Sequence, residues 1–458
     1  MRKGDDVSLP TSDTTKQADG RTTMDLGEVL PLTAQVKDDH LFVGGVDMVE
    51  LAREQGTTLI VFDEADLRSR MSTYVESFAA EYPAPTHVAY ASKAFLNKEV
   101  CRIANELGMS LDVSGGGELA CAQSVGFPME RVIVHGNNKT PQELEEAISA
   151  GAGRIVVDSR IELGRVSQIA SRLDKVQDIY MRITPGVEAD THEYIRTGCE
   201  DSKFGFTMRE DFAFNCVKDA LEAPNVRLAG LHCHIGSQIF ALHSFKEAAA
   251  VMVDFIARIK EHYGYTIEEL DLGGGLGIAY MAEDAPSSIQ EFAKITCQSV
   301  KELCQERGLD LPVLSVEPGR SLVANAGLTL YTVGILKTLP GIRNIVAIDG
   351  GMSDNIRPAL YGSEYEAVVA NRAGQPRNKV VTLVGKHCES GDYVVADGSI
   401  QAPELGDVVC VFGTGAYCAT MSSNYNGQPK PAVVFVKDGQ ARVVTRRETY
   451  AELYARDL

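Results

Sequence analysis

The chain has 458 residues, of which 44% are hydrophobic and 23% are charged, and its formal net charge is −19. This length predicts two or three domains of ordinary soluble globular composition. The excess of acidic residues argues against nucleic acid and anionic membranes as partners, because both require clustered cations. Ten cysteines are scattered without a CxxC pair, and no apolar stretch is long enough for a membrane span, so we expect free thiols and a cytoplasmic protein.

Residues 1–30 are predicted to be a disordered N-terminal extension, because they are mostly polar and contain no apolar segment. Residues 31–55 follow as a second N-terminal segment, in which DHLFVGG at 39–45 has the composition of a strand. We expect this segment to join a β domain formed further along the chain.

The region 56–318 is predicted to be a (β/α)8 barrel of the TIM type. Short β-branched runs recur in it, each followed by a polar or glycine-rich loop and, in several cases, by a stretch with helical periodicity. Thr140 and Glu143 have the spacing of a capping box, and Gly151 ends the same predicted helix. Eight such runs favour a closed barrel over an open doubly wound sheet. They lie at residues 87–91, 110–113, 131–136, 154–159, 178–186, 226–236, 267–275 and 311–319.

Residues 319–458 show a different pattern, in which strands are joined by turns such as Lys437-Asp438-Gly439 and helical candidates are short. This region is predicted to be an all-β C-terminal domain. Its strands are expected in the segments LTLYTVGILKTL, NIVAIDGG, AVVAN, KVVTLVG, DVVCVFG and PAVVFVKDGQARVV.

Reactive side chains are expected at the carboxyl ends of the barrel strands. Lys93 follows the first strand, in HVAYASKAF, where a buried ammonium is costly unless it is paired or neutral; a lysine that only reaches solvent is the alternative. His135 lies at the end of the third strand, His234 and Ser237 at the end of the sixth, and Glu317 at the end of the eighth. These groups are predicted to converge on one mouth of the barrel.

The segment DLGGGLG places Gly273, Gly274 and Gly275 after the seventh strand. Their bare backbone N–H groups can approach a phosphate closely, although a sharp turn without a ligand has the same composition. Arg320 in EPGR, after the eighth strand, would supply a second anion-binding group, unless it is an exposed surface arginine. Barrels of this type often bind phosphate with their last two loops, which favours a phosphate site.

The segment LHCHIGSQ contains His232 and His234, a pair that raises the question of a metal. No other His or Cys pair has ligand spacing, so we predict no metal site. His234 is then either a core histidine or a flat platform for an aromatic ring, with Ser237 donating to phosphate. A strand-end lysine, a phosphate cradle, a ring platform and Glu317 as partner of a pyridine nitrogen together predict a pyridoxal phosphate site.

The segments that contain these residues resemble the fold-type III pyridoxal phosphate-dependent decarboxylases, and within them the diaminopimelate decarboxylases. The resemblance extends over residues 90–421 in the order of the family, and it implies a barrel with a C-terminal β domain, as in alanine racemase and ornithine decarboxylase. The matching segments are YASKAF, LDVSGGGEL, HGNNK, TGCEDSKFG, GLHCHIGSQ, DLGGGLGI, EPGRSLVANAG, DGGMSDNIRPALYG, GKHCESGD and GTGAYCATM.

The resemblance also implies roles for single residues. Lys93 would bind the cofactor's aldehyde as a Schiff base, His234 would stack on the ring, and Glu317 would contact the ring nitrogen. Further cofactor-binding residues would be Ser237, Gly274, Gly275, Gly319, Arg320 and Tyr417. The substrate ligands would be Arg320, Arg357, Tyr361, Glu389 and Tyr417. Cys388 would be a catalytic thiol near the substrate Cα, supplied by the other subunit of a homodimer whose active sites are shared.

The reaction implied is decarboxylation of meso-2,6-diaminopimelate to L-lysine, the last step of lysine biosynthesis. Racemases of the same barrel carry an arginine in place of Glu317, which counts against racemisation. Glu389 with Arg320 and Arg357 would match the distal amine and carboxylate of this small amino-acid substrate. Decarboxylases of ornithine, arginine or carboxynorspermidine remain alternatives. From other classes, a metal-dependent barrel hydrolase and a non-catalytic binding homologue remain, although the presence of Lys93 argues against the latter.

Overall fold

The computed structural model describes residues 9–187 and 202–458, which fold into two compact units. The barrel unit comprises Arg70–Gly277 and Pro286–Ser321, and the β unit comprises the chain up to Ser69 together with Ile278–Ala285 and Leu322–Leu458. Five residues of the segment TGCEDSKFG, 197–201, lie outside the described residues. Among the residues described, no helix combines the length and the apolar character needed to cross a membrane.

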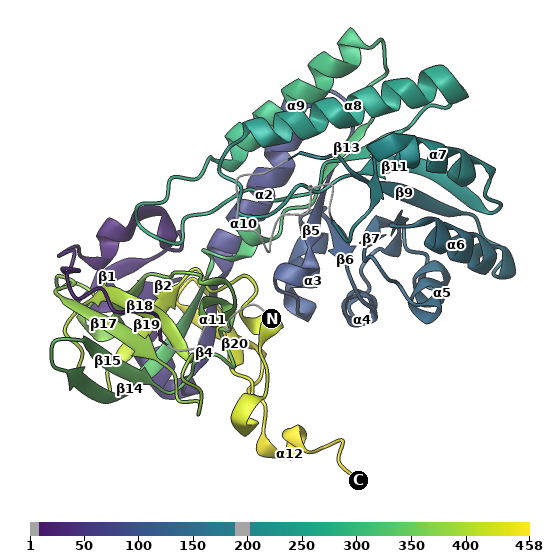
Figure 1. The fold of residues 1–458 in the computed structure, drawn as a ribbon. Helices are drawn as coiled ribbons and strands as arrows, with labels where there is room; N and C mark the ends of the chain where they lie inside the picture. The colour runs from purple at the N-terminus through teal and green to yellow at the C-terminus, as the bar shows by residue number, and fades with distance from the viewer. Residues whose placement is uncertain (1–8, 188–201) are drawn as a thin grey trace. The chain divides into compact units, whose positions relative to one another are not determined.

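The barrel unit contains all eight predicted parallel strands, and the sheet closes on itself (Figure 1). In spatial order the strands run β9-β11-β12-β13-β5-β6-β7-β8, and β8 pairs back to β9. The predicted (β/α)8 barrel is therefore confirmed. The strands are β5 (Thr86–Ala91), β6 (Ser110–Val113), β7 (Val132–Val134), β8 (Arg154–Val157), β9 (Gln177–Thr184), β11 (Val226–His232), β12 (Glu269–Asp271) and β13 (Val313–Val316), and the short β10 (Phe206–Thr207) adds to β9.

Helices alternate with these strands and lie outside them, as Figure 1 shows for α3 to α6. The capping box predicted at Thr140 and Glu143 forms, and Gly151 ends that helix in the left-handed conformation. The helices are α2 (Glu64–Glu81), α3 (Lys98–Glu106), α4 (Gly116–Ser124), α5 (Pro141–Ala150), α6 (Arg160–Arg172), α7 (Phe212–Glu222), α8 (His243–Tyr263), α9 (Ile289–Glu306) and α10 (Arg320–Val323).

The inside of the barrel is a packed core. A buried apolar layer fills it, made of Ala89, Ile133, Val156, Tyr180 and Ala229 from five strands. Near the strand beginnings, Arg154 Nε donates to Glu269 Oε2 at 2.9 Å. Because the interior is filled, the polar groups that can meet a ligand are those at the strand ends.

The β unit is built on a nine-stranded sheet in the order β18-β17-β15-β14-β4-β20-β21, with β16 paired to β19 and β19 to β14. Asp438 and Gly439, both at positive φ, form the predicted tight turn between β20 and β21. The strands are β4 (Leu59–Asp63), β14 (Gly327–Leu339), β15 (Arg343–Ile348), β16 (Ala367–Val369), β17 (Lys379–Val384), β18 (Tyr393–Ile400), β19 (Val408–Phe412), β20 (Ala432–Lys437) and β21 (Gln440–Thr445); α11 (Arg357–Tyr361) and α12 (Tyr450–Leu453) are short helices.

The division of the chain differs from the predicted domain boundaries of 56–318 and 319–458. Strand β4 pairs with β14 and β20 in the β unit, and residues 278–285 also belong there. All five residues of β4 are buried, and such an apolar run has the same appearance in a parallel barrel and at the centre of a mixed sheet. Strand β18 was not predicted, because Asp397 and Gly398 interrupt its apolar pattern.

The N-terminal segment is ordered where it is described, so the predicted disorder of residues 1–30 is wrong for residues 9–30; residues 1–8 lie outside the described part. The 3-10 helix η1 (Thr23–Val29) buries Leu26 and Val29 in the core of the β unit. Before it, Ser12 Oγ donates to the Ile342 carbonyl at 2.8 Å. A segment that adds to an existing core needs few apolar side chains, and average polarity does not reveal them.

Residues 31–55 belong to the β unit, but their strands do not enter the large sheet. β1 (Gln35–Lys37), β2 (His40–Val43) and β3 (Val46–Asp47) form a separate three-stranded antiparallel sheet, followed by α1 (Met48–Gln55). The predicted strand at 39–45 exists as β2, and the segment lies in the β unit through this small sheet of its own. Asp47 begins α1 by accepting the N–H groups of Val49 and Glu50.

Candidate active site

Lys93 lies in the single 3-10 turn η2 (Ser92–Ala94) that directly follows β5. Its side chain is 45% exposed, whereas the last four residues of β5 are buried. Nζ lies 3.8 Å from Oδ2 of Asp112, whose side chain on β6 is 1% exposed. Burial raises the pKa of Asp112, although His135 and Lys93 oppose this shift by attraction. Lys93 is therefore an accessible amine that also faces a buried acid.

Glu317 is held by two imidazoles from other strands. Nε2 of His135, after β7, lies 2.6 Å from Oε1 of Glu317, and Nε2 of His232, the last residue of β11, lies 3.0 Å from Oε2. Burial of Glu317 works against its ionisation, but the attraction and hydrogen bonds of the two histidines hold its pKa well below the usual value. Burial lowers the pKa of His232, so a neutral imidazole can donate Nε2–H to the carboxylate.

The same three residues have the composition of a cation site. Their ligand atoms lie within 4.8 Å of one another, and all three side chains are buried. Both oxygens of Glu317, however, already contact imidazole Nε2 atoms, which are the atoms that would bind a metal. This geometry favours a carboxylate held by the two imidazoles.

His234 follows β11 and is held from the neighbouring glycine loop. The N–H of Gly274 donates to Nδ1 of His234 at 3.3 Å. Burial keeps the pKa of His234 well below its usual value, so the ring stays neutral. A neutral imidazole of fixed orientation can lie against a flat aromatic ring.

The glycine loop after β12 packs so closely that only glycine fits. A Cβ on Gly274 would lie 2.1 Å from the carbonyl oxygen of Glu317. A Cβ on Gly275, at φ +125°, would lie 2.3 Å from the carbonyl oxygen of Gly236. The loops after β11, β12 and β13 therefore meet backbone against backbone, which leaves a cradle of N–H groups for an anion.

Arg320 and Ser237 add side-chain donors at the same strand ends. Nε and Nη2 of Arg320 lie 3.2 and 3.1 Å from Oγ of Ser237, and the guanidinium is buried. Gly319, just before Arg320, has no space for a side chain, because its Cβ would lie 3.0 Å from that of Ala91. The loop after β13 thus packs closely against the end of β5, which is followed by the turn that bears Lys93.

The sequence did not lead us to predict Asp112 and Arg182 as site residues. It also did not reveal that His135 and His232 contact Glu317. Asp112 is an acid inside the apolar run SLDV, and Arg182 is a buried guanidinium on β9, 4.3 Å from the ring of Phe204. A charged residue inside the last residues of a barrel strand is the pattern that could have revealed both.

In the β unit, Arg357 at the start of α11 lies near two other predicted site residues, Tyr361 and Tyr417. Its guanidinium carbon lies 5.1 Å from the centre of the Tyr361 ring and 5.6 Å from that of Tyr417. The guanidinium is buried, and Nε donates to the Tyr365 hydroxyl at 3.1 Å. Tyr417 is held at φ +60°, a conformation uncommon for a bulky residue. The aromatic rings hold the guanidinium of Arg357 in place, and this cation could bind a carboxylate.

Cys388 and Glu389 lie in the exposed turn between β17 and β18. The N–H of Cys388 donates to Oδ1 of Asn426 at 3.0 Å, and the Tyr425 hydroxyl lies 3.4 Å from Oε2 of Glu389. The buried His387 next to them bonds through Nδ1 to a carboxylate at 2.8 Å. The turn is thus anchored while its thiol and carboxylate face outward.

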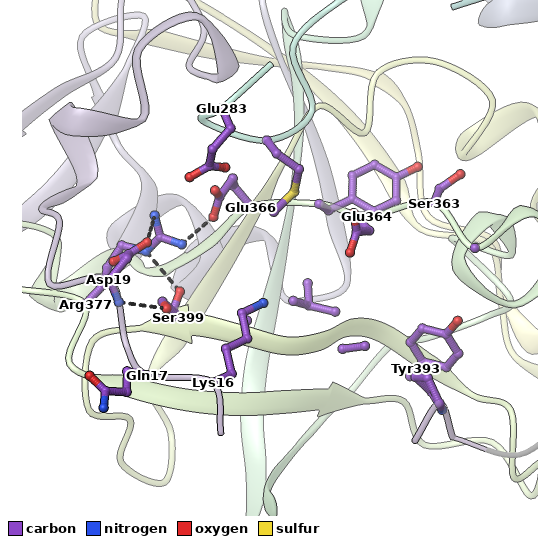
Figure 2. A pocket seen from close by; sticks show the side chains of 17 residues that line it. Lys16, Gln17, Asp19, Glu283, Ser363, Glu364, Glu366, Arg377, Tyr393 and Ser399 are labelled. Carbon is purple, nitrogen blue, oxygen red and sulfur yellow. Dashed lines mark hydrogen bonds and ion pairs between the residues drawn. The ribbon is translucent and has the colours of Figure 1, made fainter. Parts of the chain in front are cut away.

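A separate cavity of about 460 Å³ lies within the β unit, and none of the predicted site residues lines it. Figure 2 shows Lys16 and Asp19 of the N-terminal segment in its wall. Arg377, which is 1% exposed, bonds there to Asp19 and Glu366, and Nε donates to the Ser399 carbonyl (Figure 2). These contacts fasten the N-terminal segment to β18.

Known proteins are similar to this chain in sequence and in structure. The family model of the pyridoxal binding domain of pyridoxal-dependent decarboxylases matches residues 64–324. A diaminopimelate decarboxylase of Bacillus subtilis is 45% identical over 93% of this chain and 96% of its own, and one of Synechocystis is 40% identical over 99% and 97%. The solved diaminopimelate decarboxylase of M. jannaschii in complex with L-lysine is 35% identical, with a TM-score of 0.88 over 93% of this chain and 98% of its own.

Proposed function

The chain belongs to the pyridoxal-dependent decarboxylases, and within that family to the diaminopimelate decarboxylases, and on this basis we propose that it converts meso-2,6-diaminopimelate to L-lysine and carbon dioxide. This is the last step of lysine biosynthesis. The observation that carries the proposal is Glu317, which is held by a hydrogen bond to His232 and by a 2.6 Å contact with His135 at the barrel mouth that also bears Lys93, His234 and the glycine cradle.

The residues at the strand ends fit pyridoxal phosphate, the cofactor of this family. The glycine cradle that a Cβ would fill, with Ser237 and Arg320, would hold the phosphate. The neutral ring of His234 would lie against the pyridine ring, and the exposed amine of Lys93 would bind the aldehyde. Once bound, pyridoxal phosphate supplies an electron sink for the pair left at the substrate Cα when carbon dioxide departs.

Glu317 would keep a proton on the ring nitrogen. A carboxylate with a lowered pKa remains ionised and favours the protonated form of a nitrogen that it contacts. His232 forms one hydrogen bond to Oε2 and His135 contacts Oε1, which leaves lone pairs of both carboxylate oxygens for this task. The two histidines are positioning residues, because they act through Glu317.

The β unit would supply the groups that recognise the substrate. Arg357, with the rings of Tyr361 and Tyr417, suits the distal carboxylate, and Glu389 suits the distal amine. Arg320 would contribute to substrate binding as well as to phosphate binding. Cys388 would lie near the substrate Cα, and both Cys388 and Glu389 would come from the partner in a homodimer. Their exposure on an anchored turn supports this arrangement.

We infer that the enzyme acts in the cytoplasm. The nine cysteines in the described residues are all free, eight of them at least partly buried, as expected in a reducing compartment. Cell fractionation with antibody detection tests this: recovery in a membrane or secreted fraction would contradict it.

The deciding experiment combines cofactor mapping with substrate comparison. Borohydride reduction of the purified enzyme, followed by peptide mapping, should place the pyridoxyl group on Lys93 and leave Lys93→Ala unlabelled, while a variant of the exposed Lys98 is labelled normally. Carbon dioxide release should be fastest with meso-diaminopimelate and slow with ornithine, arginine and carboxynorspermidine. Labelling of a different lysine, or faster turnover of ornithine, would overturn the proposal.

A further inference from the structure

Two cysteines of the barrel unit face each other on neighbouring helices, away from any residue assigned above. Cys101 lies on α3 and Cys121 on α4, and their Sγ atoms are 3.8 Å apart. Cys101 is completely buried, whereas Cys121 is partly exposed. A disulfide requires about 2 Å between the sulfurs, so a small side-chain movement would suffice to form one.

The two thiols are not chemically equivalent. Either thiol can donate in this contact. With Cys101 as the donor, the hydrogen bond lowers the pKa of Cys121 to about 7, and Lys98 and Arg102 favour the thiolate while burial and Glu118 oppose it. The same hydrogen bond and burial raise the pKa of Cys101. The more exposed sulfur is therefore also the better nucleophile at neutral pH, and the buried one is placed to react second.

We propose that Cys101 and Cys121 form a redox-active dithiol that is oxidised to an intrachain disulfide by low-molecular-weight disulfides such as oxidised glutathione. In the first step the Cys121 thiolate attacks one sulfur of the oxidant, forms a mixed disulfide and expels one glutathione thiolate. In the second step Cys101 loses its proton, attacks Sγ of Cys121 and expels the second glutathione thiolate. The two protein thiols lose two electrons in total, which reduce the oxidant to two thiols.

The bond would connect two helices that begin at the barrel mouth. α3 follows the turn with Lys93, and α4 follows β6, which bears Asp112, the acid 3.8 Å from the Lys93 ammonium. The proposal itself concerns the thiols alone and does not depend on the substrate of the enzyme. It is therefore tested separately from the function proposed above.

The test is redox titration of the holoenzyme in glutathione buffers, followed by denaturation, alkylation of free thiols, and tryptic mapping. Trypsin cuts after Lys98, Arg102 and Arg131, so Cys101 and Cys121 fall in separate peptides with one cysteine each. Oxidising buffers should produce a joined peptide, 99–102 linked to 103–131, that is lighter than the sum of the two thiol peptides by two hydrogens. Dithiothreitol should reverse the link, and thiol modification at Cys121 should rise with pH through about 7.

Single variants separate the two steps. Cys101→Ser should stop at the glutathione adduct on Cys121, and Cys121→Ser should keep Cys101 free for alkylation after denaturation. Cys216→Ser, a variant of a buried cysteine on α7, should form the linked peptide as the wild type does. The experiment on the wild-type enzyme is sufficient by itself to test the proposal. The proposal is wrong if the folded enzyme in excess oxidised glutathione keeps both thiols open to alkylation, or if the reaction stops at the mixed disulfide.

Discussion

His135 Nε2 and Glu317 Oε1 lie 2.6 Å apart across the barrel mouth, joining the end of β7 to the loop after β13. His232 holds the other oxygen of the same carboxylate, so both oxygens are fixed by imidazoles from different strands. A buried acid would otherwise tend to take up a proton. The closed barrel thus sets the charge of the carboxylate that is proposed to keep the cofactor's ring nitrogen protonated.

Removing His135 should move the acidic limb of the pH–activity profile. The histidines lower the pKa of Glu317, and activity that requires its ionised form is lost as the pH falls through that pKa. A hydrogen bond to a charged group contributes about 1.5 to 3 kcal/mol, and one pH unit corresponds to about 1.4 kcal/mol. His135→Ala should therefore shift the limb upward by about one to two pH units.

The measurement is kcat/KM against pH together with the cofactor absorbance of the same samples, because a merely structural defect would not move a titration midpoint. His135 also faces Asp112 at 3.7 Å, and Asp271, Lys93 and Arg182 influence the same groups. His232→Ala, which removes the other bond to Glu317, should give a shift of the same sign. A variant of the exposed His243 should give none. Unchanged midpoints in both barrel variants would contradict the role given to the histidines.

Gly274→Ala should weaken cofactor binding and lower the stability of the protein. The new Cβ would lie 2.1 Å from the Glu317 carbonyl oxygen, so the loops after β12 and β13 must separate. Overpacking of this kind typically costs about 1 to 3 kcal/mol. Equilibrium dialysis with pyridoxal phosphate and thermal melts of the enzyme measure the two effects.

Gly117→Ala is the matched control, because a Cβ on this glycine of α4 would meet nothing within 4 Å. Replacing a helical glycine by alanine should leave cofactor affinity unchanged and stabilise the helix by about 0.5 to 1 kcal/mol. Equal losses of cofactor affinity in both variants would show that the effect of Gly274→Ala is unrelated to the backbone contact.

The sequence allowed prediction of the parts of the fold that repeat locally. Each barrel strand is a short apolar run followed by a polar or glycine-rich loop, so all eight were found. Candidate site residues could be proposed where they follow such a run, as Lys93 and Glu317 do. Strand β4 was assigned to the wrong unit, because burial on both faces removes the alternation that would identify its partners.

The site contacts depend on pairings that no local pattern shows. His232 and Glu317 are separated by 85 residues, and they meet because the closed sheet brings their strand ends together. Arg357 reaches the ring of Tyr417 only through the fold of the β unit. Single residues could thus be proposed from the sequence, whereas the partners that set their charge required the structure.

Arg357→Ala and Glu389→Gln should each reduce turnover of diaminopimelate. In the proposed site each variant would leave one charge of the substrate without its counterpart, and the loss of a desolvated partner typically costs about 2 to 5 kcal/mol. Steady-state kinetics should show the loss mainly in kcat/KM, and the relative rate with ornithine should rise in Arg357→Ala. Lys437→Gln, which changes an exposed residue at the β20–β21 turn, is the control and should match the wild type. Losses that are equal for all substrates would argue against a role in specificity.

The proposed sharing of active sites between two subunits predicts that two inactive variants restore each other. In a two-fold dimer each site would take Lys93 from one subunit and Cys388 from the partner, so Lys93→Ala and Cys388→Ala homodimers should both be severely impaired. When the two proteins are unfolded and refolded together in equal amounts, about half of the dimers are mixed, and each mixed dimer has one site with both residues intact.

Activity of the refolded mixture should therefore recover to about 25% of the wild-type value by this counting. Two different affinity tags, one on each variant, allow the mixed dimers to be purified and counted, and wild-type enzyme taken through the same refolding gives the reference. If both residues of a site came from one chain, one site of every mixed dimer would lack Lys93 and the other would lack Cys388, so no site would be intact and mixing would restore nothing. Verified mixed dimers without recovered activity would therefore rule out the shared site.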